Sequence, residues 1–442
     1  MSHACPDANA SLQGQAGQEQ AGRGRAGRGR AGIDSFHIEC FEEGNQKMQS
    51  TGEQQMVTTG RESRLIALAA AVLACLISVA PAAAQQAATT KPQMVEDVFK
   101  NVQVLKGMPV NQFMETMGFF AASLGLNCTG CHTAESLQDW SKFADEVPRK
   151  RTARAMIRMV DSINKEKFGG ARMLTCWSCH RGAEVPQTVP SLAEQYTVAP
   201  EDPNAIEIVP GMPKEPTADQ ILDKFIQASG GAQRLAALTS WTATGTFEGF
   251  DTYHTKVPVD IYAKAPAQRT MIAHTQNGDS TTVFDGMAGW IAGPDRPLPL
   301  IPMLPGPEFD GGKLDAVLGF PGGIRQALTD WKVGFPVTTI EDKPVNIVQG
   351  TGAGKTRVKL YFDQKTGLLT RQVRYSDTPI GMVPIQIDYT DYRDVAGVKL
   401  PYHIVITWTD GQSDIELTGI QPNVPIDAAK FAKPAPANAK YK

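Results

Sequence analysis

Two short strings constrain this chain more than any other feature: Cys128-Thr129-Gly130-Cys131-His132 and Cys176-Trp177-Ser178-Cys179-His180. On a helical turn the cysteines of such a string stand at i and i+3 and the histidine at i+4, so all three side chains project from one face. The two thiols can then bond to the vinyl groups of one porphyrin while the imidazole reaches its iron, which is the pattern of c-type haem attachment. The strings therefore predict two covalently bound haems c, with His132 and His180 as iron ligands.

A shared zinc site and a redox dithiol are the alternatives for the same residues. Zinc knuckles usually lie about 12–20 residues apart, whereas 45 positions separate Cys131 from Cys176. A thioredoxin-like dithiol belongs beside a βαβ unit, but the sequence around both strings has helical periodicity. Two copies of the complete string favour haem over both alternatives.

The segment 61–84 has the order of a secretory signal peptide. Arg61 and Arg64 precede an apolar run that ends at Val79, and an A-x-A cleavage site closes the segment at Ala84. The run is short for a membrane span. We therefore expect export to the periplasm, with a retained N-terminal anchor helix as the alternative.

The other three cysteines support this interpretation. Cys5, Cys40 and Cys75 precede Ala84, so cleavage there would leave only the cysteines of the two strings. Cys75 follows Val72-Leu73-Ala74, a loose lipobox-like context, so a lipidated N-terminus is a further alternative.

Residues 1–60 are rich in Gln, Gly and Ala, and Ala-Gly-Arg-Gly-Arg occurs twice, at 21–25 and 26–30. Such a segment cannot bury a core. It is predicted to be either disordered or untranslated, with the true start at Met48 or Met56. The net charge of −3 gives no sign of a nucleic-acid partner.

The exported chain divides into two predicted domains joined by a linker. Residues 92–190 are expected to be mainly helical, with helices near Asn111–Ala122 and Thr152–Lys165. Prolines crowd the linker, 191–216, which should be extended. From 217 to 436 the pattern changes to the alternation typical of an antiparallel sheet. The predicted fold class is thus a helical dihaem domain followed by a curved β half-barrel with a helical start.

The second domain is expected to open with a helix that is capped by Thr217 and stopped by Gly230-Gly231. A Pro/Gly-rich insert (297–323) and a short helix near Arg325–Trp331 should interrupt the strands. The predicted strands are Trp241–Phe247, Val257–Ala263, Thr281–Phe284, Arg357–Phe362, Leu368–Tyr375, Ile385–Tyr389 and Ile404–Thr409.

The glycine-rich stretch from Gly350 to Thr356 imitates a phosphate-binding loop. Its glycine spacing is wrong, since Gln349 stands where the first glycine should be. A strand rather than a helix is expected after it, so no helix N-terminus would face an anion. We interpret it as a hairpin turn.

Each iron also needs a sixth ligand or an open face. Methionines lie upstream of both strings, Met114 and Met117 on one predicted helix and Met156 and Met159 on the other. Methionines at this spacing are often core filler. The repeated order of helix and then haem string favours one ligand per helix, and His/Met ligation suits outer-sphere electron transfer.

At these residues the chain resembles the cytochrome subunit of photosynthetic reaction centres over residues 95–195. The matching strings are Phe99–Leu105, Glu115-Thr116-Met117, Ala153–Met156 with Ile163-Asn164, and Cys179–Gly182 with Pro186 just beyond. The resemblance implies Met117 as the ligand opposite His132 and Met156 as the ligand opposite His180. That family has four haems, and this chain has only the first two attachment sites, which implies a non-photosynthetic relative.

More weakly, the second domain resembles the LolA-type periplasmic lipoprotein carriers. The resemblance rests on Ile221–Gly231, Asp285-Gly286 with Gly289-Trp290, Leu360–Leu369, and Asp388–Leu400 with Pro401. It implies a curved half-barrel over a cavity of lipid size, which could hold an acyl chain or a quinone. A docking module without a ligand is the alternative.

The predicted function is therefore electron transfer between redox proteins in the periplasm. Membrane-bound proteins are included among the partners that this function allows. A dihaem peroxidase-like enzyme and a redox-linked lipid or quinone carrier or sensor are the alternatives. A basic cluster formed by Arg149, Lys150, Arg151, Arg154 and Arg158 is expected to contact haem propionates, to steer an acidic partner, or to be a solvated helix face.

Overall fold

The computed structural model describes residues 91–191, 202–205, 208, 216–249, 252–294, 298–334 and 338–437. The segments 1–60 and 61–84 and most of the 191–216 linker lie outside these residues. The chain divides into Met1–Ala82 and Ala83–Lys442, and the description that follows is of the second unit. None of its described helices is long and apolar enough to cross a membrane.

Helices dominate the region around the two strings, as their periodicity predicts. The two predicted helices are α3 and α5, and each is a few residues longer than expected. Gly125 ends α3 in the left-handed conformation (φ 62°), which glycine adopts without strain. The elements of this region are α2 (Val95–Val98), α3 (Val110–Leu124), α4 (Cys128–Cys131), η1 (Ala134–Leu137), η2 (Trp140–Ala144), α5 (Pro148–Lys167) and α6 (Cys176–His180).

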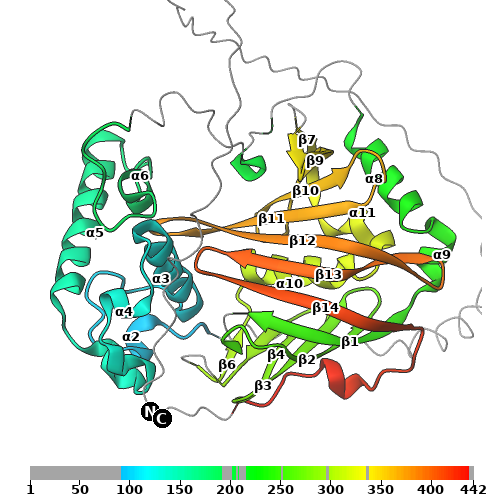
Figure 1. Ribbon diagram of the computed structural model, residues 1–442, viewed down its shortest axis with the longest axis horizontal. Coiled ribbons are helices and arrows are strands. Elements are labelled where there is room, and N and C mark those ends of the chain that lie inside the picture. The colour runs from blue at the N-terminus through cyan, green and yellow to red at the C-terminus, as the bar shows by residue number, and fades with distance from the viewer. Residues whose placement is uncertain are drawn as a thin grey trace, which may run out of the picture. The chain divides into compact units, whose positions relative to one another are not determined.

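The second half of the chain forms one open antiparallel sheet of 14 strands (Figure 1). All seven predicted strands are present, most of them longer than expected. The strands are β1 (Ser240–Gly249), β2 (Val257–Lys264), β3 (Gln268–Thr275), β4 (Gly278–Phe284), β5 (Gly289–Ala292), β6 (Leu300–Pro302), β7 (Thr329–Val333), β8 (Thr338–Ile340), β9 (Lys343–Thr351), β10 (Arg357–Asp363), β11 (Leu369–Thr378), β12 (Gly381–Val395), β13 (Val398–Trp408) and β14 (Gly411–Pro422).

The strands that come first and last in the sequence, β1 and β14, are neighbours in the middle of the sheet. The order runs β6-β5-β4-β3-β2-β1-β14-β13-β12-β11-β10-β9-β7, with β8 paired to β9. Trp241 of β1 pairs with Pro422 of β14, and Phe247 pairs with Ile415. The predicted opening helix is α8 (Ala218–Ala228), and Thr217 caps it with Gln220 in a capping box.

The sheet curves around helix α10 (Pro307–Leu318), which contacts β3 and β4 on one half and β11 on the other. Six steps of about 4.8 Å separate β3 from β11 along the sheet. They amount to about 29 Å, whereas twelve helical residues extend only about 18 Å. One helix can reach both strands only because the sheet bends, so the predicted curved antiparallel fold is confirmed.

The concave face is packed with side chains from α8, α10 and α11 (Ile324–Ala327). Leu222, Leu314 and Ile324 are at most 1% exposed and lie in one apolar cluster with Phe362 and Val358. A polar group lies under α10 as well. Gln372 Nε2 donates to Asp315 Oδ1 and to the Tyr389 hydroxyl, both at 2.8 Å. Among the described residues, the concave face of the sheet is therefore filled by a packed core and not by a lipid-sized cavity.

Three local expectations can be compared with this fold. The insert 297–323 contains α10, which its prolines and glycines did not suggest. The short helix ends at Ala327, and Trp331 lies on β7 instead. The glycine-rich stretch is a hairpin turn between β9 and β10, as expected, and Asp310 of α10 accepts hydrogen bonds there from the Gly354 N–H, the shorter at 2.8 Å.

Part of the predicted linker is ordered. Pro203–Ala205 forms a 3-10 turn, η3, whose carbonyls accept hydrogen bonds from sheet side chains. The Tyr361 hydroxyl donates to Pro203 O and the Tyr375 hydroxyl to Asn204 O, each at 2.9 Å. The linker is thus anchored to the sheet at this point. The exact domain limits, 92–190 and 217–436, stay predictions.

Candidate functional site

The first string folds as a short helical turn, α4, that places Cys128 and Cys131 at i and i+3. Asn127 caps this turn, because its Oδ1 accepts a hydrogen bond from Gly130 N at 3.2 Å. His132 N still donates to Cys128 O at 2.9 Å, but His132 itself is extended (φ −113°, ψ 162°). The helix therefore ends one residue earlier than the string suggested.

The His132 ring lies against aromatic residues of η2. Its centroid is 4.8 Å from that of Phe143 in an edge-on arrangement. Burial lowers the pKa of His132 to about 4, and the positive charge of Lys150 acts in the same direction. The imidazole is therefore neutral at physiological pH, which is the form that binds a metal. Its Nδ1 is buried and has no hydrogen-bond partner among the described residues.

The second string forms α6, and here the histidine is part of the helix. Thr175 and Ser178 make a reciprocal capping box at its start. His180 Nδ1 lies 3.0 Å from Ala183 O. Because a carbonyl can only accept, this contact places the ring proton on Nδ1 and leaves Nε2 available as a ligand.

Asn164 anchors the loop that leads into the second string. It is 7% exposed; its Nδ2 donates to Leu174 O at 2.8 Å, and its Oδ1 accepts from the N–H groups of Met173 and Leu174. These three bonds hold the chain just before Cys176. The sequence offered Asn164 only as part of a matching string, with no role attached.

Arg149 connects the two strings, a role that its membership of a basic cluster did not reveal. One guanidinium nitrogen donates to Gly130 O, between the cysteines of the first string, at 2.7 Å. The other lies 2.9 Å from a carboxylate oxygen of Glu184, four residues after His180. The pair is half exposed, so its energy is small, but its geometry ties the two loops together.

The two predicted methionine ligands lie on the helices that precede the strings. Met117 is half-buried on α3 and packs beside Val95, Leu105 and Met108. Met156 is 42% exposed on α5. Met114 and Met159 are 40% and 47% exposed. Each helix therefore presents a methionine before its string, but the ligation itself stays a prediction.

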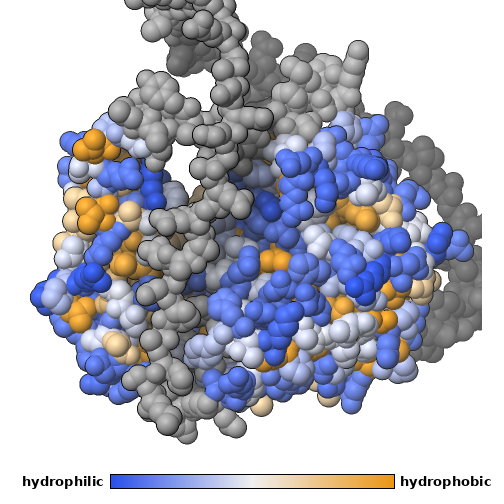
Figure 2. Space-filling model, viewed as in Figure 1, coloured by the Kyte–Doolittle hydropathy of each residue, from blue (hydrophilic) through white to orange (hydrophobic). Residues whose placement is uncertain are grey.

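The surface around the strings fits a large apolar group. Most of the exposed large hydrophobic residues of the described chain belong to residues 114–189, including Met156, Met173 and Trp177, although the sheet holds far more residues. Figure 2 shows such hydrophobic patches on the face where α5 and α6 lie. The four thiols of the strings form no disulfide. Free thiols, neutral or oriented imidazoles and uncovered apolar side chains together suit two covalently attached porphyrins.

The other residues of the basic cluster have different surroundings. Lys150 Nζ donates to Phe143 O and Asp145 O, and Arg154 forms a two-bond ion pair with Glu146 at 2.7 and 2.9 Å. Arg151 and Arg158 line an open hollow beside Arg154. By helical spacing this face of α5 is opposite Met156. The role of the cluster stays open between the three predicted alternatives.

Helix α3 is also held by the sheet. Gln112 Nε2 donates to Asp377 O at 2.9 Å, and Ser376 Oγ donates to Glu115 Oε1 at 3.2 Å. Phe119 packs so closely on Gly381 that a β carbon there would lie 2.4 Å from its ring. Burial raises the pKa of Glu115 to about 7, and the charge of Glu308 raises it as well.

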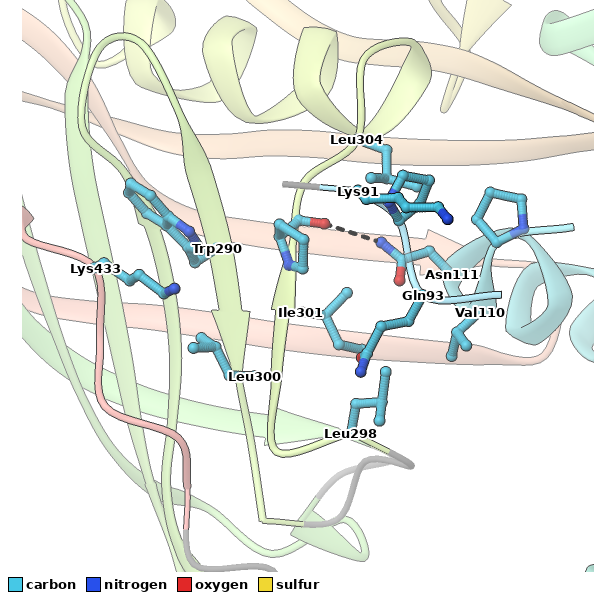
Figure 3. A pocket seen from close by; sticks show the side chains of 13 residues that line it. Lys91, Gln93, Val110, Asn111, Trp290, Leu298, Leu300, Ile301, Leu304 and Lys433 are labelled. Carbon is cyan, nitrogen blue, oxygen red and sulfur yellow. Dashed lines mark hydrogen bonds between the residues drawn. The ribbon is translucent and has the colours of Figure 1, made fainter. Parts of the chain in front are cut away.

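A pocket of about 250 Å³ lies where the start of α3 meets β5 and β6 (Figure 3). Asn111 Nδ2 bridges the two sides, with Pro302 O at 3.3 Å and Glu308 Oε2 at 2.6 Å. Lys91 and Lys433 lie at its sides. The apolar lining comes from Val110, Trp290, Leu298, Leu300, Ile301 and Leu304. The pocket is small and lies at the edge of the sheet, not under α10.

Comparison with known proteins agrees with the two expected resemblances. Residues 69–208 match the family model described as photosynthetic reaction centre cytochrome C subunit. The photosynthetic reaction center cytochrome c subunit of Rubrivivax gelatinosus is 32% identical over 132 residues, which are 28% of this chain and 32% of that protein. Cytochrome c-554 of Chloroflexus aurantiacus is 30% identical over 140 residues, 28% of this chain and 32% of that protein. The chain spans about a third of the length of these curated relatives.

Solved structures match about half of the chain. A LolA superfamily protein from Nitrosomonas europaea is 14% identical, with a TM-score of 0.34, over 50% of this chain and 99% of that one. A DUF1329 family protein from Desulfovibrio piger is 10% identical, with a TM-score of 0.36, over 49% of this chain and 98% of that one. These values describe a distant likeness and carry no information about a ligand.

Proposed function

We propose that this chain is an exported dihaem c-type cytochrome. The proposal starts from residues 69–208, which match the family model of the reaction-centre cytochromes. Cys128 and Cys131 would hold one haem and Cys176 and Cys179 the other. His132 with Met117, and His180 with Met156, would be the axial ligands. The chain would pass electrons between redox proteins in the periplasm, where the 61–84 segment would direct it.

The observation that supports this proposal most is the repeated order of a long helix with methionines and then a short helical turn with two free thiols and a histidine. When bound, haem supplies a one-electron carrier. The chain's part would be to fix each porphyrin through two cysteines and to supply a histidine and a methionine as ligands. Burial keeps the His132 imidazole neutral, and the contact with Ala183 O orients the His180 imidazole. With both axial positions filled, no site is left for substrate on the iron.

The carrier alternative receives less support from the sheet. Helix α10 and its apolar neighbours fill the concave face, and a buried polar group lies beneath it. A lipid would have to displace Leu314, which is 1% exposed. No specific observation favours a peroxidase over electron transfer.

The test is a haem count and a redox titration of protein matured in a periplasm. Intact mass should show two haems per chain, and the optical titration should resolve two one-electron steps. Replacing Met117 or Met156 with alanine should each abolish one methionine-to-iron charge-transfer band and lower one midpoint potential. Met114→Ala and Met159→Ala are matched controls on the same helices. A high-spin haem in the unaltered protein would contradict the proposal.

A further inference from the structure

The turn between β13 and β14 brings a carboxylate to the first haem string. This turn consists of Thr409 and Asp410, since Trp408 and Gly411 are the last paired residues of the hairpin. It sits on Gly118 of α3, the residue after Met117. A β carbon at Gly118 would lie 2.7 Å from Asp410 Oδ1 and 3.0 Å from Thr409 Oγ1. The turn can come this close only because residue 118 has no side chain.

Asp410 also acts on α4. Burial raises the pKa of the Cys128 thiol, and the negative charge of Asp410 raises it further. Asp410 is therefore close enough to both α3 and α4 to affect each. These helices carry Met117 and Cys128–His132, and a turn of three residues joins them. A porphyrin bound by Cys128 and Cys131 and by Met117 would contact both helices, and Asp410 would then lie near its edge.

No basic side chain neutralises this carboxylate within the described ranges of the chain. Asp410 takes part in no ion pair there, and its pKa shift has no contribution from Lys, Arg or His. Desolvation raises its pKa, while a hydrogen bond from the Trp408 side chain lowers it. Asp410 is an exposed residue, so solvent limits the desolvation. An aspartate carboxyl ordinarily titrates near pH 3.9, about three units below neutrality, and we take Asp410 to be ionised at pH 7.

We propose that the β13–β14 turn forms one wall of the first haem site, and that the negative charge of Asp410 lowers the midpoint potential of the haem held by Cys128 and Cys131. The oxidised haem carries one more positive charge than the reduced haem, so a nearby carboxylate stabilises the oxidised form. The sheet would thus contribute to the potential of the first haem. This inference rests on the proposed function.

The test is a redox titration of Asp410→Asn at neutral pH, which removes the charge and keeps the shape. One midpoint potential should rise and the other should stay. Asp342→Asn is the matched control, because Asp342 lies in another hairpin turn, between β8 and β9, at the far edge of the strand order. Asp410→Glu restores the charge and should return the potential toward that of the unaltered protein.

Chains that attach a single haem identify which potential moves. With Cys176 and Cys179 both replaced by serine, Asp410→Asn should still raise the remaining potential. With Cys128 and Cys131 replaced, it should have no effect. The inference would be overturned if Asp410→Asn shifted the midpoint potential of the second haem alone. It would also be overturned if Asp410→Glu shifted the potential as much as Asp410→Asn does. If the unaltered chain attaches no haem, the proposed function fails; if it attaches two and Asp410→Asn shifts neither potential, only this inference fails.

Discussion

Leu314→Ala tests whether α10 is part of the core of the sheet or a lid over a ligand chamber. Leu314 is 1% exposed and lies in the apolar cluster on the concave face. The mutation removes three carbon atoms at about 0.8 kcal/mol each, or about 2.4 kcal/mol. The cavity left behind raises the expected loss to about 3–4 kcal/mol, since sheet and helices surround the site.

The assay is urea unfolding of the haem-loaded protein, followed by far-ultraviolet circular dichroism. The transition of the sheet should move to lower urea with an unchanged slope. Met287→Ala is the control, because Met287 is 63% exposed in the β4–β5 turn and should cost less than about 0.5 kcal/mol. The haem potentials should not change in either variant.

A loss below about 1 kcal/mol for Leu314→Ala would refute the reasoning. It would mean that α10 packs loosely and can be displaced. Native mass spectrometry of the purified protein should then be searched for a bound lipid, and the carrier alternative would regain support.

Three further predictions follow from the site. Glu115→Gln should remove a pH dependence of stability. The folded pKa of about 7 exceeds the ordinary 4.5, so the contribution of Glu115 to stability is fully present below pH 4.5 and falls by about 3 kcal/mol as the pH rises from 4.5 through 7, whereas the glutamine variant should show no such fall. Unfolding at pH 5 and pH 8 checks this, with the exposed Glu341→Gln as control; parallel pH profiles for Glu115→Gln and the unaltered protein would contradict it. Asn164→Ala should cost about 1–3 kcal/mol and lower haem occupancy at the second string, because three partly buried backbone groups lose their bonds. Asn127→Ala is the comparison variant. It removes the cap of α4 and a hydrogen bond from the Thr129 hydroxyl, and it should cost about 1 kcal/mol. Equal haem occupancy at the second string in the two variants, measured by mass spectrometry, would show that Asn164 is not an anchor.

Local patterns predicted seven of the fourteen strands and the helices α3, α5 and α8, because those patterns are local in origin. The capping box at Thr217, the glycine pair after α8 and the alternation of β2 each depend on residues only a few positions apart. The spacing of Cys128, Cys131 and His132 likewise identifies its chemistry without any tertiary contact. These features could therefore be derived from the sequence.

Features that depend on distant partners could not be derived in this way. Helix α10 lies in a stretch whose glycines suggested a loop. A β carbon at Gly311 would lie 2.6 Å from Arg374 Nε of β11, so this glycine allows the helix and the strand to approach closely. The contact of Asp410 with α3 joins residues nearly three hundred positions apart. Arg149 and Asn164 stabilise the two strings through hydrogen bonds to backbone groups. Such bonds cannot be predicted from a pattern of residue types.

The order of the strands has a consequence for the timing of assembly. β1 cannot pair with β14 until β14 has been synthesised, and two of the hairpins that contact α3, β11–β12 and β13–β14, also come late in the chain. Contacts of such long sequence separation form slowly, and chains fold from the N-terminus during synthesis. We therefore expect both haem strings to be accessible to the attachment machinery early, and the last four strands to close over the first site only after its haem is in place.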